Sequence, residues 1–563
     1  MPEIIVRSVD EAACARLSAA GCDARLARLF AARGLTSMDE LATSLHALAA
    51  PERLSHVREA ARLLADAIAR REKLLVVADY DADGATACAV AVKALRAMGA
   101  IVDYIVPNRA EHGYGITPEI VDEAAKRRPD ILITVDNGIA AVEGIARANA
   151  LGMRVLVTDH HLPGAELPAA ACIVNPNQAG CGFPSKNLAG VGVVFYVMLA
   201  LRAELRVRGA FAPRAEPNLA ELLDLVALGT VADVVKLDAN NRILVTQGLA
   251  RIRAGKASPG IAALFEVAGR TTRAASPYDL GFAAGPRLNA AGRLDDMSLG
   301  IECLLAVDAP RALELATRLD RLNRERREIE ADMQESALAL VGDVRPGGDY
   351  TLSVHHPRWH AGVVGLLASR LKDRFHRPVF AFATERDGRL KGSGRSIAGL
   401  HLRDALDLVA KRKAGLLERF GGHAGAAGVT IGADALEEFR ASFEAVAREA
   451  LTPADLRLTI ETDGSLPAAE IGLDLADKLR RCVWGQGFPE PRFVGRFAVE
   501  SQRVVGEKHV KAVLRLDGRR FSAIRFGSAE ALTTTVEAVY RLELNEFQGN
   551  SELQLVIEQV VSE

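Results

Sequence analysis

A series of short, continuously apolar segments separated by helical stretches constrains this chain more than any other feature of its sequence. Strands buried on both faces of a parallel sheet have such unbroken apolar runs, whereas half-exposed strands alternate. Here the runs lie at 73–78, 102–107, 130–135, 154–158 and 172–176. The helical stretches between them lie at 85–99, 117–127 and 140–150. Repeated strand–helix units of this kind predict a doubly wound α/β domain with a parallel sheet.

The rest of the chain indicates a multidomain α/β protein. Its 563 residues correspond to three or four domains at ~150 residues each. A long charged helix is expected at 308–340, and short strands with Gly-marked turns after residue 457 predict a small β-barrel. The expected parts are 1–50, a helical extension; 51–250, the parallel-sheet domain; 251–343, a helical connector with the long linking helix; 344–452, a smaller α/β domain; and 453–563, the barrel.

Composition limits the classes of protein to which this chain can belong. With 49% hydrophobic and 25% charged residues, it is not a disordered, collagen-like or disulfide-scaffold protein. The formal net charge is -2, so any contact with nucleic acid must depend on local basic patches. The seven cysteines are scattered without a CxxC pair, which favours a reducing compartment. No signal peptide is recognisable and the longest apolar run, 191–201, is too short for a bilayer, so we expect a cytoplasmic protein with no membrane contact.

Acidic and histidine side chains follow three of the predicted strands, at the point where each strand ends. These residues are Asp79, Asp81 and Asp83 after the first strand, Asp136 after the third, and Asp159, His160 and His161 after the fourth; Asp233 follows a further apolar run. Ligands of open parallel sheets bind at this carboxyl edge. So many like charges would repel without a counter-ion, and Asp and His ligands without thiolate favour Mn²⁺ or Mg²⁺. Two such ions ~3.5–4 Å apart are the usual arrangement for phosphodiester hydrolysis.

A plainer interpretation of these aspartates remains open. An Asp at a strand end is also a common helix N-cap or turn residue, and for Asp136 alone the two interpretations are equally good. For Asp79, Asp81 and Asp83 together the plain interpretation is weaker, because one cap needs only one side chain. A dinucleotide site is disfavoured, since no GxGxxG follows the first strand and no GxxxxGK[ST] occurs.

Four segments, in this order, resemble the motifs of the DHH phosphoesterase superfamily. They are DYDADG (79–84), VDNGI (135–139), TDHH (158–161) and GTVADVV (229–235). Two more, SGRS (393–396) and GGHAGAAG (421–428), resemble the associated DHHA1 domain, and the C-terminal barrel resembles an OB-fold. Four others are typical of the RecJ family of exonucleases: NRAEHGYG (108–115), GPRLNAAGR (285–293), HHPRWHAGVVGLLASRL (355–371) and WGQGFPEPRF (484–493). The resemblance covers nearly the whole chain.

The RecJ resemblance implies a single-strand-specific DNA exonuclease that works 5′ to 3′, releases mononucleotides and takes part in DNA repair and recombination. It implies two Mn²⁺ or Mg²⁺ ions, with single-stranded DNA, a single-strand-binding protein and a helicase as partners. By the family pattern the metal ligands would be Asp81, Asp83, Asp136, His160, His161 and Asp233. Asp79 would be a ligand or would orient one. The residues nearest the chemistry would be Asp136, His160 and His161, with Asp136 positioning the attacking hydroxide between the ions.

Further candidates would hold the phosphates of the substrate. Ser393, Arg395 and Ser396 lie in a Gly-rich segment where the backbone can approach a phosphate and Arg can bind it with two hydrogen bonds, although a plain Gly turn is the alternative. Gly422 and His423 resemble an anion-binding nest at a helix start, and a tight helix-packing turn is an equally good interpretation. Arg109, Arg287 and Arg293 could clamp a 5′-phosphate or hold a carboxylate of another domain.

The predicted barrel has a basic stripe in an otherwise slightly acidic protein. Segment 503–525 contains seven Lys or Arg residues and two acidic ones, a local charge of +5, and Phe521 and Phe526 interleave with them. OB-folds bind single strands with such basic grooves and stacking aromatic rings. Lys508, Lys511 and Arg519 are therefore candidate contacts to the strand, whereas the phenylalanines are slightly better explained as core residues.

Two other functions compete with the exonuclease. A small-substrate DHH phosphoesterase would act on oligoribonucleotides, cyclic dinucleotides or pyrophosphate, but such proteins are typically shorter and lack a C-terminal barrel. A replication scaffold built on an inactive DHH core would have lost metal ligands, and here all of them are present.

Overall fold

The computed structural model describes residues 2–107, 115–212, 215–342, 348–385, 387–547 and 550–562. Its first domain contains a five-stranded sheet in which every pairing is parallel, in the order β3-β2-β4-β5-β6. The strands are β2 (Lys73–Ala78), β3 (Ile101–Ile105), β4 (Ile131–Val135), β5 (Arg154–Thr158) and β6 (Cys172–Val174). The predicted parallel sheet is confirmed, and all of β4 is buried, as its unbroken apolar sequence requires.

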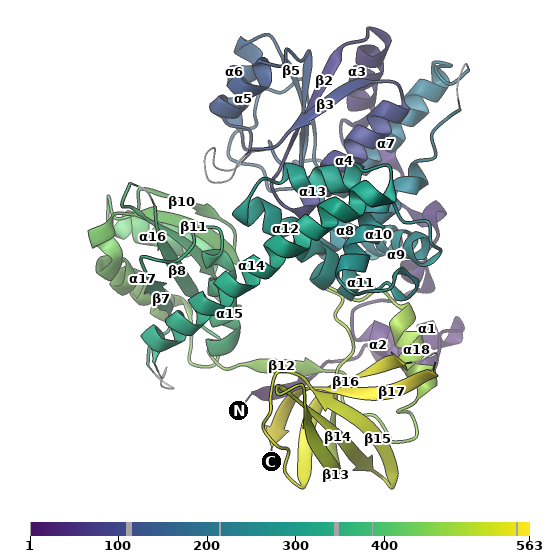
Figure 1. Cartoon of the computed structure of the whole chain (residues 1–563), viewed down its shortest axis with the longest axis vertical. Coiled ribbons are helices and arrows are strands. Elements are labelled where there is room, and N and C mark those ends of the chain that lie inside the picture. Colours follow the sequence, from purple (N-terminus) through teal and green to yellow (C-terminus); the bar gives the residue numbers. More distant parts are fainter. Residues whose placement is uncertain are drawn as a thin grey trace.

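Helices cover both faces of this sheet (Figure 1). In β2, Leu74 and Val76 belong to one core cluster with residues of α3 (Val57–Ala69), α4 (Ala82–Ala97) and α7 (Gly190–Val207). The alternate residues Leu75 and Val77 belong to a second cluster with α5 (Pro118–Ala125) and α6 (Val142–Ala150). The side chains of one strand thus serve two cores, because successive residues of a strand point to opposite faces.

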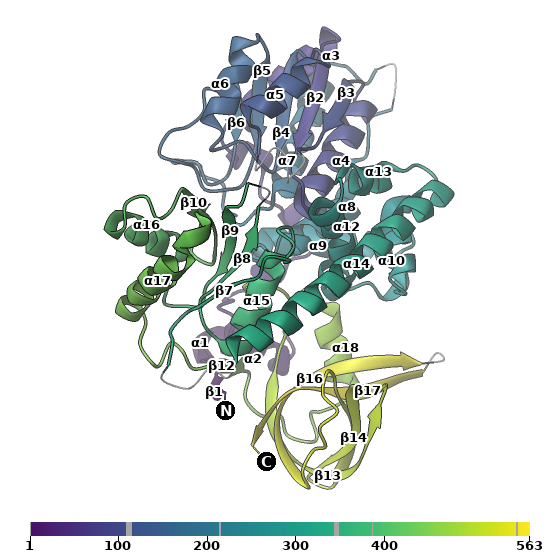
Figure 2. The ribbon, with the colours of Figure 1, turned by 60° about the vertical axis from the view of Figure 1, so that its left-hand side comes forward.

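A helical region connects the two α/β domains. After α8 (Leu223–Ala232) and α9 (Ala239–Arg253) come α10 (Pro259–Val267), α11 (Pro277–Asp279), a π-helical turn η6 (Leu280–Ala284), α12 (Gly285–Leu294) and α13 (Ser298–Leu305). The long helix expected at 308–340 is α14 (Ala309–Val341), which runs from this region to the second α/β domain (Figures 1 and 2).

The second α/β domain has a mixed sheet in the order β10-β11-β9-β8-β7. Its strands are β7 (Leu352–His355), β8 (Val379–Thr384), β9 (Leu390–Arg395), β10 (Arg419–Gly422) and β11 (Ala426–Ile431). Its helices are α15 (Val364–Phe375), α16 (Leu402–Arg412) and α17 (Leu436–Ala450). Phe380 and Phe382 of β8 pack edge-to-face on Phe439 of α17, which fixes the sheet against that helix.

The C-terminal strands close into a barrel in the order β13-β14-β15-β17-β16, which confirms the OB-like prediction. They are β13 (Phe493–Val505), β14 (His509–Leu516), β15 (Arg519–Arg525), β16 (Thr535–Phe547) and β17 (Asn550–Ser562). A helix before the barrel, α18 (Leu473–Arg481), packs on β16. Phe497, Leu514 and Phe521 lie in the barrel core.

The N-terminal segment holds the barrel and its linker to the rest of the molecule. Strand β1 (Glu3–Val6), which the sequence analysis missed, pairs in parallel with β12 (Thr459–Thr462). Two helices follow, α1 (Glu11–Ala19) and α2 (Ala24–Ala31). Next to α2, Arg33 forms a two-pronged ion pair with Asp463 (2.7 and 2.9 Å), and both side chains are at most 2% exposed. Phe30 stacks on Trp484 and Phe488.

Two global features complete the description. No helix among the described residues is long and apolar enough to cross a bilayer. All seven cysteines lie within the described ranges, and each of them is a free thiol.

We predict that Asp463→Asn loosens the barrel from the body. The substitution leaves the buried Arg33 guanidinium without its counter-charge, which typically costs about 3–5 kcal/mol. Urea unfolding should show a lower midpoint, and limited proteolysis should cut near the linker. The matched control is Glu449→Gln, which breaks the exposed pair with Arg412 and should cost at most about 1 kcal/mol. Equal effects of the two substitutions would contradict the role given to the buried pair.

Candidate metal centre

The loop after β2 places its three aspartates differently. Asp81 is the N-cap of α4 and accepts a hydrogen bond from the Gly84 N–H (3.0 Å). Asp83 lies inside the first turn of α4, and its two oxygens accept from the N–H groups of Gly190 and Val191 at the start of α7 (2.7 and 2.9 Å). The plain role as a helix cap therefore applies to Asp81, whereas the carboxylate of Asp83 binds the start of α7.

Asp136 follows β4 in a left-handed conformation, with φ 64°. Its N–H donates to the Thr158 carbonyl (3.0 Å), so the chain turns sharply at the sheet edge. Its carboxylate lies against the start of α7, where a Cβ on Gly190 would come within 2.4 Å of Asp136 Oδ1. Only a glycine at 190 leaves room for this carboxylate.

Asp159 fixes the two histidines that follow it. Its Oδ1 accepts hydrogen bonds from the His160 and His161 N–H groups (2.7 and 3.1 Å) and lies 2.7 Å from His161 Nδ1. Its other oxygen accepts from the Ile139 N–H (2.9 Å). Burial opposes ionisation of Asp159, but these hydrogen bonds together lower its pKa. Burial lowers the pKa of His161, but the bond with Asp159 and the charges of Asp159, Asp79 and Asp81 together raise it to about 9 in the metal-free protein.

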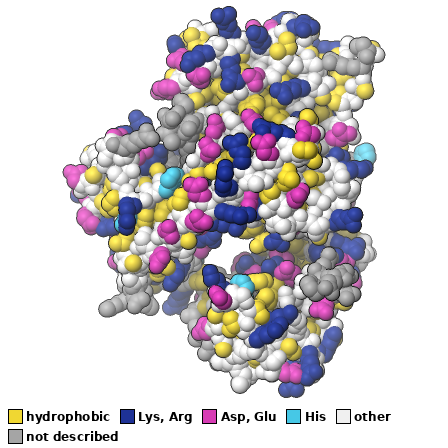
Figure 3. All heavy atoms as spheres, viewed as in Figure 1, with side chains coloured by type: hydrophobic (Ala, Val, Ile, Leu, Met, Phe, Trp, Pro, Cys, Tyr) yellow, Lys and Arg dark blue, Asp and Glu magenta, His cyan; other side chains and the backbone are white. Residues whose placement is uncertain are grey.

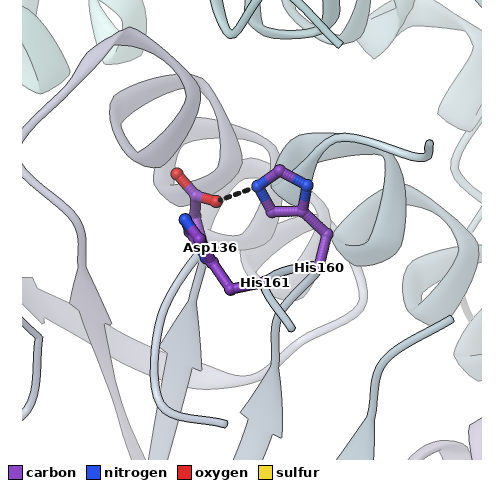
Figure 4. Close-up of side chains that lie close together, drawn as sticks. All are labelled: Asp136, His160 and His161. Carbon is purple, nitrogen blue, oxygen red and sulfur yellow. Dashed lines mark ion pairs between the residues drawn. The ribbon is translucent and has the colours of Figure 1, made fainter. Parts of the chain in front are cut away.

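The structure brings all seven predicted ligands together at one edge of the sheet. Three overlapping sets each place their ligand atoms within 4.8 Å of one another: Asp136, His160 and His161; Asp83, His160 and Asp233; and Asp79, Asp81 and Asp136. Asp136 and His160 belong to two sets each, and Figure 4 shows their side chains pointing at each other, with His160 Nε2 3.1 Å from Asp136 Oδ1. Asp233 enters from the end of α8, with Oδ2 3.5 Å from His160 Nε2.

The charges at this centre are unbalanced. Burial first, and then the neighbouring carboxylates, raise the pKa values of Asp79, Asp136 and Asp233 well above the usual range. Burial and Asp81 raise that of Asp83 to about 7. Burial lowers the pKa of His160 to about 4, so this imidazole is neutral and can bind a metal.

Three buried atoms support a cation here. Asp79 Oδ1, Asp136 Oδ1 and His160 Nε2 form no hydrogen bond among the described residues; the 3.1 Å contact between the last two joins two acceptor atoms, because the neutral His160 ring has its hydrogen bond with the Leu188 backbone. Buried polar atoms without partners are costly, and cations that these atoms could ligate would remove both that cost and the repulsion. Carboxylate and imidazole ligands without thiolate fit Mn²⁺ or Mg²⁺.

Three asparagines that the sequence analysis missed hold the loops of the centre. Asn175 and Asn177, just after β6, donate to the His161 and His160 carbonyls (2.9 and 2.6 Å). Asn289 of α12 accepts from the Ala82 N–H (2.8 Å). The first two follow the strand at 172–174, so the strand-end pattern that revealed the aspartates could also have revealed them.

Two of the predicted phosphate contacts lie across from the metal centre, on the second α/β domain. Burial, and then the charges of Arg395 and His161, lower the pKa of His423, so His423 is within electrostatic range of both. Arg395 at the end of β9 donates to the Ser393 hydroxyl and the Gly394 carbonyl (3.2 and 2.8 Å). The Ser396 hydroxyl is engaged internally and donates to the Leu400 carbonyl (2.8 Å).

The prediction that 421–428 is a helix-start nest is wrong. The segment forms the turn of a hairpin, in which Gly422 ends β10 and Ala426 begins β11. Gly422 has φ 141°, and a Cβ there would come within 2.4 Å of the Ala426 carbonyl oxygen, so the glycine serves strand pairing. The exposed tip nevertheless carries His423, whose N–H donates to the Ala426 carbonyl (2.8 Å).

The three other candidate arginines have different outcomes. Arg287 is buried and pairs with Asp320 of α14 (2.8 Å), so in this structure it has the alternative role of holding a carboxylate of another element. Arg293 donates to the Gly362 carbonyl (3.1 Å) ahead of α15, at the junction with the second domain. Arg109 lies outside the described residues.

The basic stripe of the barrel is partly occupied by internal contacts. Arg519 donates to the Ala468 carbonyl of the linker, Arg520 pairs with Glu500, and Arg525 lies 3.7 Å from Glu530. Arg503 lies opposite Lys511 across the β13–β14 pair, and neither these two nor Lys508 nor Arg515 forms an ion pair with a described residue. Phe521 is buried, as the core interpretation expects, whereas Phe526 is exposed against His509.

Three family models match the chain. They are the N-terminal domain of the DHH family over residues 73–230, the DHHA1 domain over 347–449 and the RecJ OB domain over 462–559. The metal-centre residues up to Asp159, His160 and His161 lie inside the first match, and Asp233 lies three residues beyond its end.

Relatives over nearly the full length are all of one kind. The chain is 52% identical over 549 residues to the "Single-stranded-DNA-specific exonuclease RecJ" of Dickeya dadantii, with 95% of each chain covered. It is 50% identical over 552 residues to the protein of the same name from Escherichia coli, again over 95% of each. Among solved structures, RecJ of Thermus thermophilus in complex with Mn²⁺ has a TM-score of 0.81 at 30% identity, covering 100% of this chain and 79% of that one.

We predict that Asp136→Asn changes how stability depends on pH. A carboxyl group with a raised pKa stays protonated in the folded protein after it has ionised in the unfolded chain, so its stabilisation is lost as pH rises from about 4, where ordinary carboxyl groups ionise, towards neutrality. The metal-free parent should therefore unfold more easily as pH rises through this window. Asparagine removes one of the charges and tolerates the left-handed conformation at 136.

The measurement is the urea midpoint of metal-free protein across that pH window. Asp136→Asn should be the more stable protein at neutral pH, because it has one fewer buried negative charge at this centre. Added Mn²⁺ should stabilise the parent more than the variant. Parallel pH curves for the two proteins would show that Asp136 is not among the repelling carboxylates.

Proposed function

Since this chain belongs to the RecJ family, we propose that it is a single-strand-specific DNA exonuclease that works 5′ to 3′ and releases mononucleotides. One observation carries the chemistry: every predicted ligand converges on one edge of the sheet, where His161 is within electrostatic range of His423. The closed barrel disfavours the alternative of a small-substrate phosphoesterase, because a small substrate needs no extended strand-binding surface.

Each group at the centre has a role that follows from its position. The metal ligands are proposed to be Asp79, Asp81, Asp83, Asp136, His160, His161 and Asp233. Two Mn²⁺ or Mg²⁺ ions bound there would activate a water molecule and would stabilise the negative charge that develops on the phosphate oxygens. Asp159 keeps His161 oriented by its short contact with Nδ1, so that Nε2 faces the centre. Arg395 and His423 bind the phosphate of the terminal nucleotide through charge-assisted hydrogen bonds.

The finer parts of the proposal rest on the family resemblance alone. These are the 5′ to 3′ polarity, the release of mononucleotides, and a single-strand-binding protein and a helicase as partners. A cytoplasmic location is supported by the seven free thiols, which suit a reducing compartment. We also propose the division at residues 50, 250, 343 and 452 as the domain boundaries.

Product analysis tests the exonuclease. With Mn²⁺, a 5′-labelled single strand should release labelled mononucleotide from the start, while a 3′-labelled strand should shorten step by step and duplex DNA should resist. EDTA should abolish the activity and Mn²⁺ restore it, with Zn²⁺ less effective because the site lacks thiolate. Asp136→Asn, prepared in parallel, should lose at least about 100-fold, which excludes a contaminating nuclease. Full activity in EDTA, or release from the 3′ end, would refute the proposal.

Arg395→Ala should weaken the preference for a 5′-phosphorylated end. The change removes a charge-assisted hydrogen bond worth roughly 1.5–3 kcal/mol, and it should leave metal content unchanged. The measurement is the ratio of kcat/KM for 5′-phosphate and 5′-hydroxyl strands. Arg389→Ala is the matched control, because that arginine lies in the same hairpin but pairs with Asp387 and Glu418. A ratio that Arg395→Ala leaves at the parent value would place the terminal phosphate elsewhere.

A further inference from the structure

Two exposed aromatic rings stack on each other beside the metal centre. Tyr278 is 52% exposed and Phe282 is 65% exposed, with ring centroids 4.7 Å apart and planes inclined by 23°. Among the described aromatic side chains, Phe420 and Phe526 are also exposed, but neither stacks on another exposed aromatic ring. None of the sequence motifs includes Tyr278 or Phe282.

The local structure fixes both rings on one outer face. They are four residues apart across α11 and the π-helical turn η6, a spacing that puts them side by side. Ser276 and Asp279 cap this segment reciprocally, with the Ser276 hydroxyl donating to Asp279 Oδ2 (2.7 Å). Leu280 on the opposite face is fully buried. A π-helical turn inside a helix is uncommon and is frequently found at functional sites.

The segment that carries the rings lies near a proposed metal ligand. A Cβ on Gly281 would come within 3.2 Å of Val231, and a Cβ on Gly285 within 3.1 Å of Ala232. The segment that carries the rings therefore packs against the two residues that precede Asp233. A strand whose terminal phosphate is at the metal centre would pass this surface within a few nucleotides.

The same segment faces the barrel. Figure 1 shows α11 at the edge of the helical region on the barrel side, and Figure 3 shows the molecule hollowed between the barrel and the parts above it. Burial and then the charge of Arg480 lower the pKa of Arg253, while Asp279 raises it. Arg253 is therefore within electrostatic range of both Asp279 and Arg480, which belongs to α18, the helix that packs on β16. Arg270 and Arg273 are exposed just before α11, and Arg273 forms no ion pair with a described residue.

We propose that Tyr278 and Phe282 are a stacking platform for an unpaired base of the single strand, between the metal centre and the barrel. The inference rests on the proposed function, because it takes a single strand as the substrate. Every base has a π-face, so such a platform binds strands of any sequence, and nearby arginines can contact the phosphates. Duplex DNA has no free base face to offer it.

The test uses abasic sites as a probe of stacking. Strands of 5′-phosphorylated oligothymidylate, each with one abasic site at a successive position, are bound to the Asp136→Asn protein with Mg²⁺ so that they are not digested. Affinity should fall about tenfold when the abasic site occupies the platform, and little at neighbouring positions. Adding Tyr278→Ala and Phe282→Ala should weaken the intact strand by a similar factor and flatten the positional profile.

Conservative variants separate stacking from apolar contact. Tyr278→Phe with Phe282→Tyr should keep the profile, whereas Leu at both positions should lose it, because Leu supplies apolar area without a π-face. The comparison variant is Arg503→Ala, Lys508→Ala and Lys511→Ala, which should reduce the salt dependence of binding but leave the abasic profile unchanged. Thermal melting of each variant checks that these exposed substitutions leave the fold intact.

The outcomes distinguish this inference from the proposed function. If the parent protein neither binds nor degrades single strands, the proposed function fails and the platform with it. If it degrades them but the abasic profile is flat, or if the Leu variant keeps the profile, the rings do not stack on a base. The exposed pair is then an apolar surface for another protein.

Discussion

Repulsion among aspartates at one edge of the parallel sheet is the constraint around which the catalytic half of this protein is arranged. Asp79, Asp83 and Asp136 are almost completely buried, and burial makes each negative charge costly. The fold reduces this cost with helix N-termini. Asp81 is the N-cap of α4, and the start of α7 donates two N–H groups to Asp83. It does so only in part, because Asp79 and Asp136 each keep an oxygen that accepts no hydrogen bond from any described residue. The remaining negative charge favours the binding of cations at this site.

The attachment of the barrel is linked to the same centre. The Leu237 N–H donates to the Gln486 carbonyl (2.8 Å), and Gly485 and Gly487 have no room for a side chain against Leu237 and Lys236. This contact lies only a few residues after Asp233. Removing the chain beyond residue 457 would therefore uncover Arg33, Phe30 and Leu237 as well as removing the barrel. Substitutions on the barrel surface separate strand holding from chemistry more cleanly than a truncation does.

Features that depend on neighbours in the sequence could be predicted, and features that depend on distant partners could not. The five strands and the ligands at their ends follow from unbroken apolar runs and from the topology of parallel sheets, so β2 to β6 and Asp136 were found from the sequence. The pairing of β1 with β12 joins segments more than 450 residues apart, and no local pattern announces it. The same holds for Arg287 and Arg519, whose partners Asp320 and Ala468 are far away in the chain. The hairpin at Gly422 was mistaken for a helix start because glycine suits both.

The proposed metal ligands and the proposed phosphate-binding residues belong to different domains, so the distance between them depends on α14, which connects the two domains (Figure 1). At one end Asp320 of this helix pairs with Arg287 of α12, next to the metal centre. Farther along, Glu330 binds Arg326 within the helix and Arg370 of α15, in the domain that carries Arg395 and His423. The pairs of Asp320 with Arg287 and of Glu330 with Arg326 are buried on both sides, whereas Arg370 is largely exposed. Buried ion pairs contribute little net stability, but they require good geometry. We therefore interpret these ion pairs as fixing the register of α14, and through it the distance between the proposed phosphate-binding residues and the proposed metal ligands.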